Sequence, residues 1–183
     1  AGFDEMRRLR DLTRETVAIH IRLGLERICI EELESPENLK LSSGRGFVAP
    51  IYTSSIGKIL LSEIEDGELH RLLNKIQLLP MSTISITDKE GVRKELEEAR
   101  AKGYATSFGE RIPGAAAISV PIRNYICPAA LSIWGPENRF TLDVMMKVLN
   151  EVRDCARRIS DRLAERRRKE PERDGGDCWS QDC

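Results

Sequence analysis

The chain has 183 residues, of which 40% are hydrophobic and 32% charged, and its formal net charge at pH 7 is −1. This composition supplies enough apolar side chains for one packed domain with a well-solvated surface. The balanced charge gives no general attraction to nucleic acid or to acidic membranes, whereas a domain that binds DNA by itself is usually more basic.

The start of the chain and its cysteines indicate where the protein works. The first residues lack the basic and then apolar pattern of a signal peptide, and the longest apolar stretch, residues 126–134, is too short to cross a bilayer. Five scattered cysteines are typical of reduced cytosolic thiols. We therefore expect a cytoplasmic protein without membrane contact. Because residue 1 is alanine, we also expect a part of a longer protein.

Hydrophobic spacing predicts a helix and then several strands in the first third of the chain. Apolar residues recur at helical spacing over residues 3–14. From residue 16 the period changes to two, which places Val17, Ile19 and Ile21 on a buried face and His20 on the exposed face. Strands are expected at residues 16–23, 26–33, 38–42 and 47–52.

The rest of the chain alternates between helices and strands. Three helices are expected at residues 54–64, 67–79 and 88–102, the last with a capping box made by Thr87 and Glu90. Strands follow at residues 104–108, 115–122 and 128–134. A long helix from residue 141 carries an apolar seam that needs a partner, either the sheet or another subunit. Residues 166–183 are expected to form a disordered tail.

This order of short strands, hairpin links and helices predicts an α+β domain with a mainly antiparallel sheet. The hairpin of residues 115–134 has one ordinary core face, with Ile118, Val120 and Leu131. Its other face has small or polar side chains and one large aromatic: Ala117, Ser119, Pro121, Ala130, Ser132 and Trp134. This face either leaves room for a small ligand or lets helices pack closely, and the periodicity favours neither.

Hydroxyl-bearing residues begin the helix expected at residues 54–64, in the sequence Thr53-Ser54-Ser55-Ile56-Gly57-Lys58. Free backbone N–H groups and the helix dipole make such an end favourable for a carboxylate or another anion. A plain N-terminal cap is the commoner use of the same residues. The loop at residues 109–114 can also line a site, although its Glu-Arg pair is more typical of a surface.

Motifs of the common enzyme classes are missing. The sequence contains no G-x-S-x-G, no H-E-x-x-H and no glycine-rich loop with a Walker lysine. Its two histidines, His20 and His70, are fifty positions apart, and no Cys/His spacing fits a zinc site. We therefore predict no catalytic residue, no metal and no cofactor.

Five blocks of sequence follow one another as in a known family. Residues 9–17 are similar to its opening helix and strand, and residues 52–61 resemble its A-x-G-K-A-x-L-A block. Residues 85–88 with 96–105 resemble T-I-T-D…L-x-x-x-R-x-x-G-Y-A, whereas residues 110–122 and 129–136 resemble E-x-x-x-G-x-x-x-I-A-x-P-V and A-A-L-S-V-S-G-P. Together they resemble the C-terminal effector-binding domain of IclR-type transcriptional regulators.

The resemblance implies a GAF-like fold, with a curved, mainly antiparallel sheet of about six strands flanked by helices. Residues 1–14 would be a linker helix leading from an absent winged helix-turn-helix domain, and residues 15–165 would bind a small-molecule effector. The protein would be a homodimer or homotetramer and would contact DNA only through the absent domain.

The resemblance also implies pocket positions, which we combine with the helix end and the small-residue face of the hairpin. The expected effector-binding residues are Ser54, Ser55, Ile56, Gly57, Ser107, Ala117, Ser119, Ser132 and Trp134. Trp134 stands where a small serine is common, and Ile56 replaces a small residue. These departures predict a smaller and more apolar pocket, and hence an aromatic or otherwise apolar acid rather than a glyoxylate-like acid.

Two other functions stay open. The apolar seam of the last helix suits an oligomerisation module whose pocket is filled. A hydrolase with a serine or cysteine nucleophile on the same scaffold is the weaker alternative, because no base lies near any candidate nucleophile.

Overall fold

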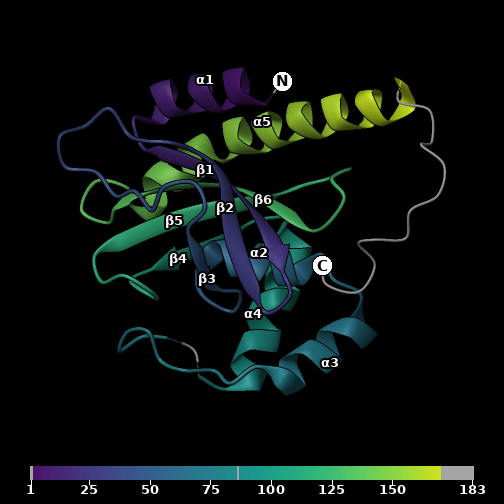
Figure 1. The fold of residues 1–183 in the computed structure, drawn as a ribbon. Helices are drawn as coiled ribbons and strands as arrows, with labels where there is room; N and C mark the ends of the chain where they lie inside the picture. Colours follow the sequence, from purple (N-terminus) through teal and green to yellow (C-terminus); the bar gives the residue numbers. More distant parts are fainter. Residues whose placement is uncertain (1, 86, 170–183) are drawn as a thin grey trace.

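Six strands and five helices make up the computed structural model, which describes residues 2–85 and 87–169 (Figure 1). The strands are β1 (Thr16–Leu23), β2 (Glu26–Leu33), β3 (Val48–Pro50), β4 (Ala105–Phe108), β5 (Ala115–Ile122) and β6 (Ala129–Pro136). They form one sheet in the order β3-β2-β1-β6-β5-β4, and every neighbouring pair is antiparallel. The curled sheet with its flanking helices confirms the predicted α+β, GAF-like fold.

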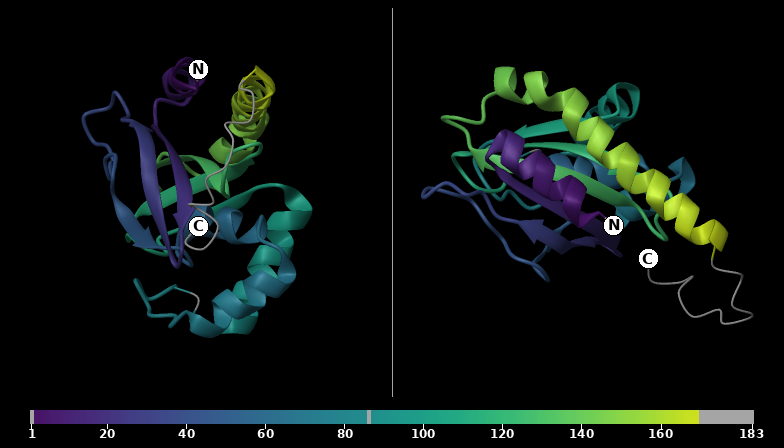
Figure 2. Two further views of the ribbon diagram at one scale, coloured as in Figure 1. Left: turned by 45° about the vertical axis from the view of Figure 1, so that its right-hand side comes forward. Right: turned by 90° about the horizontal axis from the view of Figure 1, so that it is seen from above.

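The helices cover the sheet on both faces (Figure 2). They are α1 (Phe3–Thr13), α2 (Ser54–Ser62), α3 (Asp66–Lys75), α4 (Lys89–Lys102) and α5 (Leu142–Lys169). α1 and α5 lie side by side on one face, where Met6 and Met145 join Ile118 and Leu131 in one core. α2, α3 and α4 build a second core on the other face. The apolar seam of α5 therefore has the sheet and α1 as its partners.

Several boundaries differ from the predicted ones. Residues 38–42 are not a strand, and α4 is capped by Asp88, whose side chain accepts a hydrogen bond from the Gly91 N–H, instead of by Thr87. α5 continues to Lys169, so residues 166–169 are helical where a disordered tail was expected. The rest of the predicted tail lies outside the described residues. None of the described helices is long and apolar enough to span a membrane.

β1 is covered on both sides. Val17 is fully buried and Ile19 and Ile21 pack against the same core, as predicted, but Ala18, His20 and Arg22 on the other side are buried as well. The alternation was recognised correctly, but it does not show that the rest of the chain covers both faces. α2 and α3 lie over the side of His20, so the prediction that His20 faces solvent is wrong.

Candidate functional site

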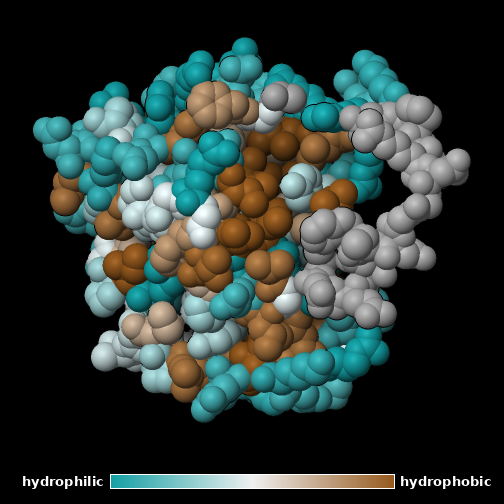
Figure 3. Space-filling model, in the orientation of Figure 1, coloured by the Kyte–Doolittle hydropathy of each residue, from teal (hydrophilic) through white to brown (hydrophobic). Residues whose placement is uncertain are grey.

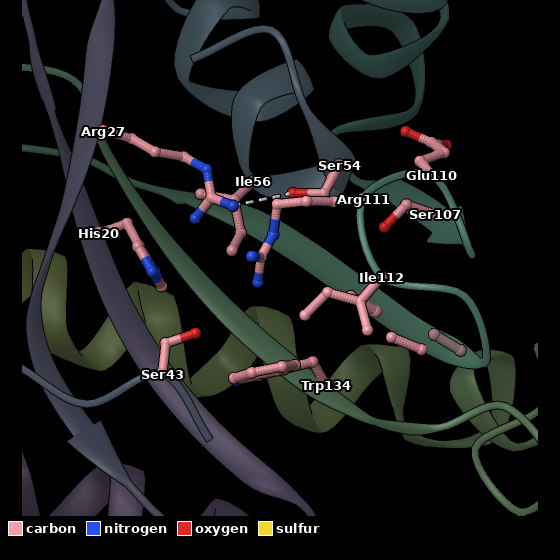
Figure 4. Close-up of a pocket in the computed structure, with 13 residues that line it drawn as sticks. His20, Arg27, Ser43, Ser54, Ile56, Ser107, Glu110, Arg111, Ile112 and Trp134 are labelled. Carbon is pink, nitrogen blue, oxygen red and sulfur yellow. Dashed lines mark hydrogen bonds between the residues drawn. The ribbon is translucent and has the colours of Figure 1, made fainter. Parts of the chain in front are cut away.

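A cavity lies between strands β1 and β2, the start of α2, the rim of the β5–β6 hairpin and the loop of residues 109–114 (Figure 4). About 440 Å³ of space, part of it open to solvent, lies between its walls. Its lining residues are His20, Arg27, Ser43, Ser54, Ile56, Ser107, Glu110, Arg111, Ile112, Ala115, Ala116, Ala117 and Trp134. The space suits a small molecule, and a larger one would require side chains at the wall to move.

The structure divides the nine predicted site residues into two groups. Ser54, Ile56, Ser107, Ala117 and Trp134 line the cavity, and their role in binding stays a prediction. The other four, which do not line it, are Ser55, Gly57, Ser119 and Ser132.

The second group holds α2 tightly against the hairpin. The Ser55 and Ser119 hydroxyls are 2.8 Å apart, and Ser119 donates to Ser132 at 3.1 Å, with all three side chains fully buried. A Cβ atom at Gly57 would lie only 1.8 Å from the carbonyl oxygen of Ile51. The centre of the small-residue face is therefore filled by α2, and the cavity remains only toward its Ala117 and Trp134 end.

Arg27 on β2 is the most unusual residue of the cavity. It is only 2% exposed, and its Nη2 donates a long hydrogen bond of 3.4 Å to Ser54 Oγ. Its Nε has no hydrogen-bond partner. Burial, together with repulsion from Arg111, lowers the pKa of the Arg27 guanidinium from 12.5 to about 9. This cation is thus held in the interior without an opposing carboxylate.

Other buried charges among the described residues are neutralised. Arg22 lies 2.6 Å from Glu68, and Lys58 lies 2.6 Å from both Glu95 and Glu110. The buried carboxylates Glu5 and Glu15 are paired with arginines in the same way. Because burying an unpaired charge is costly, the exception at Arg27 calls for a physical explanation.

Three more polar groups point into the same cavity. Arg111 enters from the loop of residues 109–114, and burial lowers the pKa of its guanidinium (Figure 4). His20 Nδ1 and Trp134 Nε1 are buried and have no hydrogen-bond partner. Two guanidinium groups and two unsatisfied ring nitrogens therefore surround one space, an arrangement suited to an anion with additional polar atoms.

The N-terminus of α2 has an anion supplied by the protein itself. The Glu110 carboxylate accepts a hydrogen bond from the Ser54 backbone N–H and another from Lys58 Nζ at 2.6 Å. Burial raises the pKa of Glu110 above its usual value, although Lys58 opposes this shift. The helix end that we expected to hold a ligand carboxylate thus already faces Glu110. The guanidinium groups of Arg27 and Arg111 have no carboxylate partner among the described residues, although Arg111 also lies over the Phe47 ring.

Arg27, Arg111 and His20 were not among the predicted site residues. The Glu-Arg pair of the 109–114 loop was interpreted as a surface feature, and the face of β1 that carries His20 was expected to be exposed. These residues also make the cavity more cationic than the predicted apolar pocket. No group of three or more metal-ligating side chains occurs in residues 2–85 and 87–169.

Comparisons with known proteins identify the class to which this fold and cavity belong. Residues 4–161 match the family model described as the bacterial transcriptional regulator IclR C-terminal domain. The HTH-type transcriptional repressor AllR of Escherichia coli strain K12 is 34% identical over 160 residues, which are 86% of this chain and 59% of that protein. The regulator KipR of Bacillus subtilis strain 168 is 30% identical and covers 81% of this chain and 60% of its own length.

A solved structure agrees with these matches. The IclR protein of Thermotoga maritima superimposes with a TM-score of 0.82 at 27% identity, over 88% of this chain and 66% of that one. The chain belongs to the IclR family and corresponds to its C-terminal domain. It spans about three fifths of the length of the curated relatives, which are named regulators and not enzymes.

The unpaired charge of Arg27 leads to a prediction about stability. We expect Arg27→Met to raise the free energy of unfolding in anion-free buffer by about 1–3 kcal/mol, because an apolar side chain replaces a buried, uncompensated cation. The matched change Arg22→Met should lower it, since Glu68 would lose its partner. Urea denaturation measures both, and a loss of stability in Arg27→Met would contradict this interpretation of the cavity.

His20 gives a prediction about pH. Burial, and then repulsion from Arg27 and Arg111, lowers the pKa of His20 well below 6.5. Below pH 6.5 only the unfolded chain binds this proton, so folding stability falls as the pH falls. We expect His20→Gln to remove about 1.4 kcal/mol of the stability lost between about pH 7.5 and 5.5. An unchanged dependence in His20→Gln would refute the burial of a neutral imidazole.

Proposed function

We propose that this chain is the effector-binding domain of a transcriptional regulator and that its cavity binds a small carboxylate or aromatic acid. The buried and unpaired guanidinium of Arg27 carries this proposal, because an anion is the partner that the described residues do not provide. The apolar parts of the wall, at Ile56, Ile112 and Trp134, would contact the body of the acid.

The position of the cavity suits control of a neighbouring domain. His20 lies in the cavity on β1, and β1 begins three residues after Thr13, the last residue of α1. α1 would lead from a winged helix-turn-helix domain outside this chain, through which the protein would contact DNA. A ligand that contacts β1 more strongly in one arrangement of α1 shifts the equilibrium toward that arrangement.

We further propose a cytoplasmic homodimer or homotetramer. The seam of α5 is covered within the chain, and a second apolar surface is available for self-association. Figure 3 shows a hydrophobic area in the middle of one face, over the region where β1 and β2 lie in Figure 1. On these strands and the turn between them, Leu23 and Leu25 are exposed and Ile21 and Ile28 are partly exposed. Sedimentation at several concentrations would measure the assembly.

A thermal-shift screen of organic acids tests the binding function. We expect at least one small carboxylate to raise the melting temperature in a concentration-dependent manner, because a ligand that binds only the folded state stabilises it. Arg27→Gln should lose this response, whereas Arg22→Gln, whose parent side chain pairs with Glu68, should keep it. If no acid stabilises the wild type at millimolar concentration, the cavity is not a sensor and the filled oligomerisation module is the better account.

A further inference from the structure

The charge of the cavity narrows the class of ligand further. Resting on the proposed function, we infer that the effector is a dianion, a small dicarboxylate that neutralises both Arg27 and Arg111 and presents further polar atoms to Trp134 and His20. This assignment goes beyond a carboxylate in general, since it specifies two negative charges and a short spacer between them.

A single carboxylate does not balance the positive charge of the cavity. Arg27 and Arg111 point into the same cavity and are close enough to repel each other (Figure 4). A monoanion would neutralise one of the two guanidinium groups and leave the second without a counter-charge in a partly desolvated space. A dianion would neutralise both, and charge-assisted pairs of this kind are the strong ones.

The acidic side chains near the cavity already have partners within the protein. Glu110 is paired with Lys58, and Glu31 lies 3.6 Å from Arg45. Glu32 accepts hydrogen bonds from the backbone N–H groups of residues 43 and 44. Cys29 follows Arg27 by two residues on β2. Burial raises the pKa of its thiol to about 12, so the thiol is neutral at pH 7. None of these neighbouring side chains therefore supplies an anion for Arg27 or Arg111.

The polar groups around the cavity come from four different segments of the chain. Arg27 enters from β2, Arg111 from the 109–114 loop, His20 from β1 and Trp134 from β6, so the donors approach from different sides (Figure 4). The wall also includes apolar side chains, among them Ile56 and Ile112. Two carboxylates on a short carbon spacer can meet donors that approach from several sides and contact the apolar wall through the spacer, whereas a compact phosphate has no apolar part.

The test compares diacids with their own half-esters by isothermal titration calorimetry. Succinate, glutarate and isophthalate are each paired with their monomethyl ester, which keeps the carbon spacer and removes one charge, and methyl phosphate serves as a compact dianion. We expect at least one diacid to bind about tenfold or more tightly than its half-ester. Arg27→Gln and Arg111→Gln should each reduce this ratio to about threefold or less, while Arg22→Gln leaves it unchanged.

Each other outcome has a defined meaning. If half-esters bind as tightly as diacids, or if only monoacids bind, the dianion is wrong and the proposed sensor function stands. If methyl phosphate binds as tightly as the best diacid, the dicarboxylate assignment is wrong. If no acid binds a chain that is folded by circular dichroism, both proposals fail. A ratio that survives both Arg27→Gln and Arg111→Gln overturns the assignment to these two residues.

Discussion

A positive charge buried without a counter-charge is the constraint on which the account of this protein depends. Arg27 is as inaccessible as a core leucine, yet the acidic residues around it are paired elsewhere. Removing a cation from water is unfavourable unless something replaces the lost hydration. A fold selected only for stability would place an apolar side chain here, and we therefore propose that a ligand completes the site.

The scaffold explains why this cavity lies where it does. Three buried serines and Gly57 bring α2 into close contact with the centre of the hairpin, which leaves space only at the rim. Glu110 then faces the N-terminus of α2 and Lys58, and this pairing fixes the loop from which Arg111 enters the cavity. The same contacts that stabilise the second core thus leave two cations directed at one space.

Much of the fold could be predicted from the sequence, because it follows from local periodicity. Alternation over residues 115–134 predicted both hairpin strands and identified the small-residue face, whose Ala117 and Trp134 end borders the cavity, and five of the nine proposed residues line it. The roles of His20, Arg27 and Arg111 could not be predicted in this way. Alternation does not show that both faces of β1 are covered, and the absence of a counter-charge depends on contacts between residues far apart in the chain.

Anomalous scattering from a crystal of this chain soaked in iodide would show whether an anion binds beside the buried, unpaired Arg27. We expect an iodide peak between the Arg27 and Arg111 side chains and none beside Arg22, which already has Glu68 as its partner. A cavity without iodide, or an Arg27 guanidinium found in contact with a carboxylate of the protein itself, would contradict it.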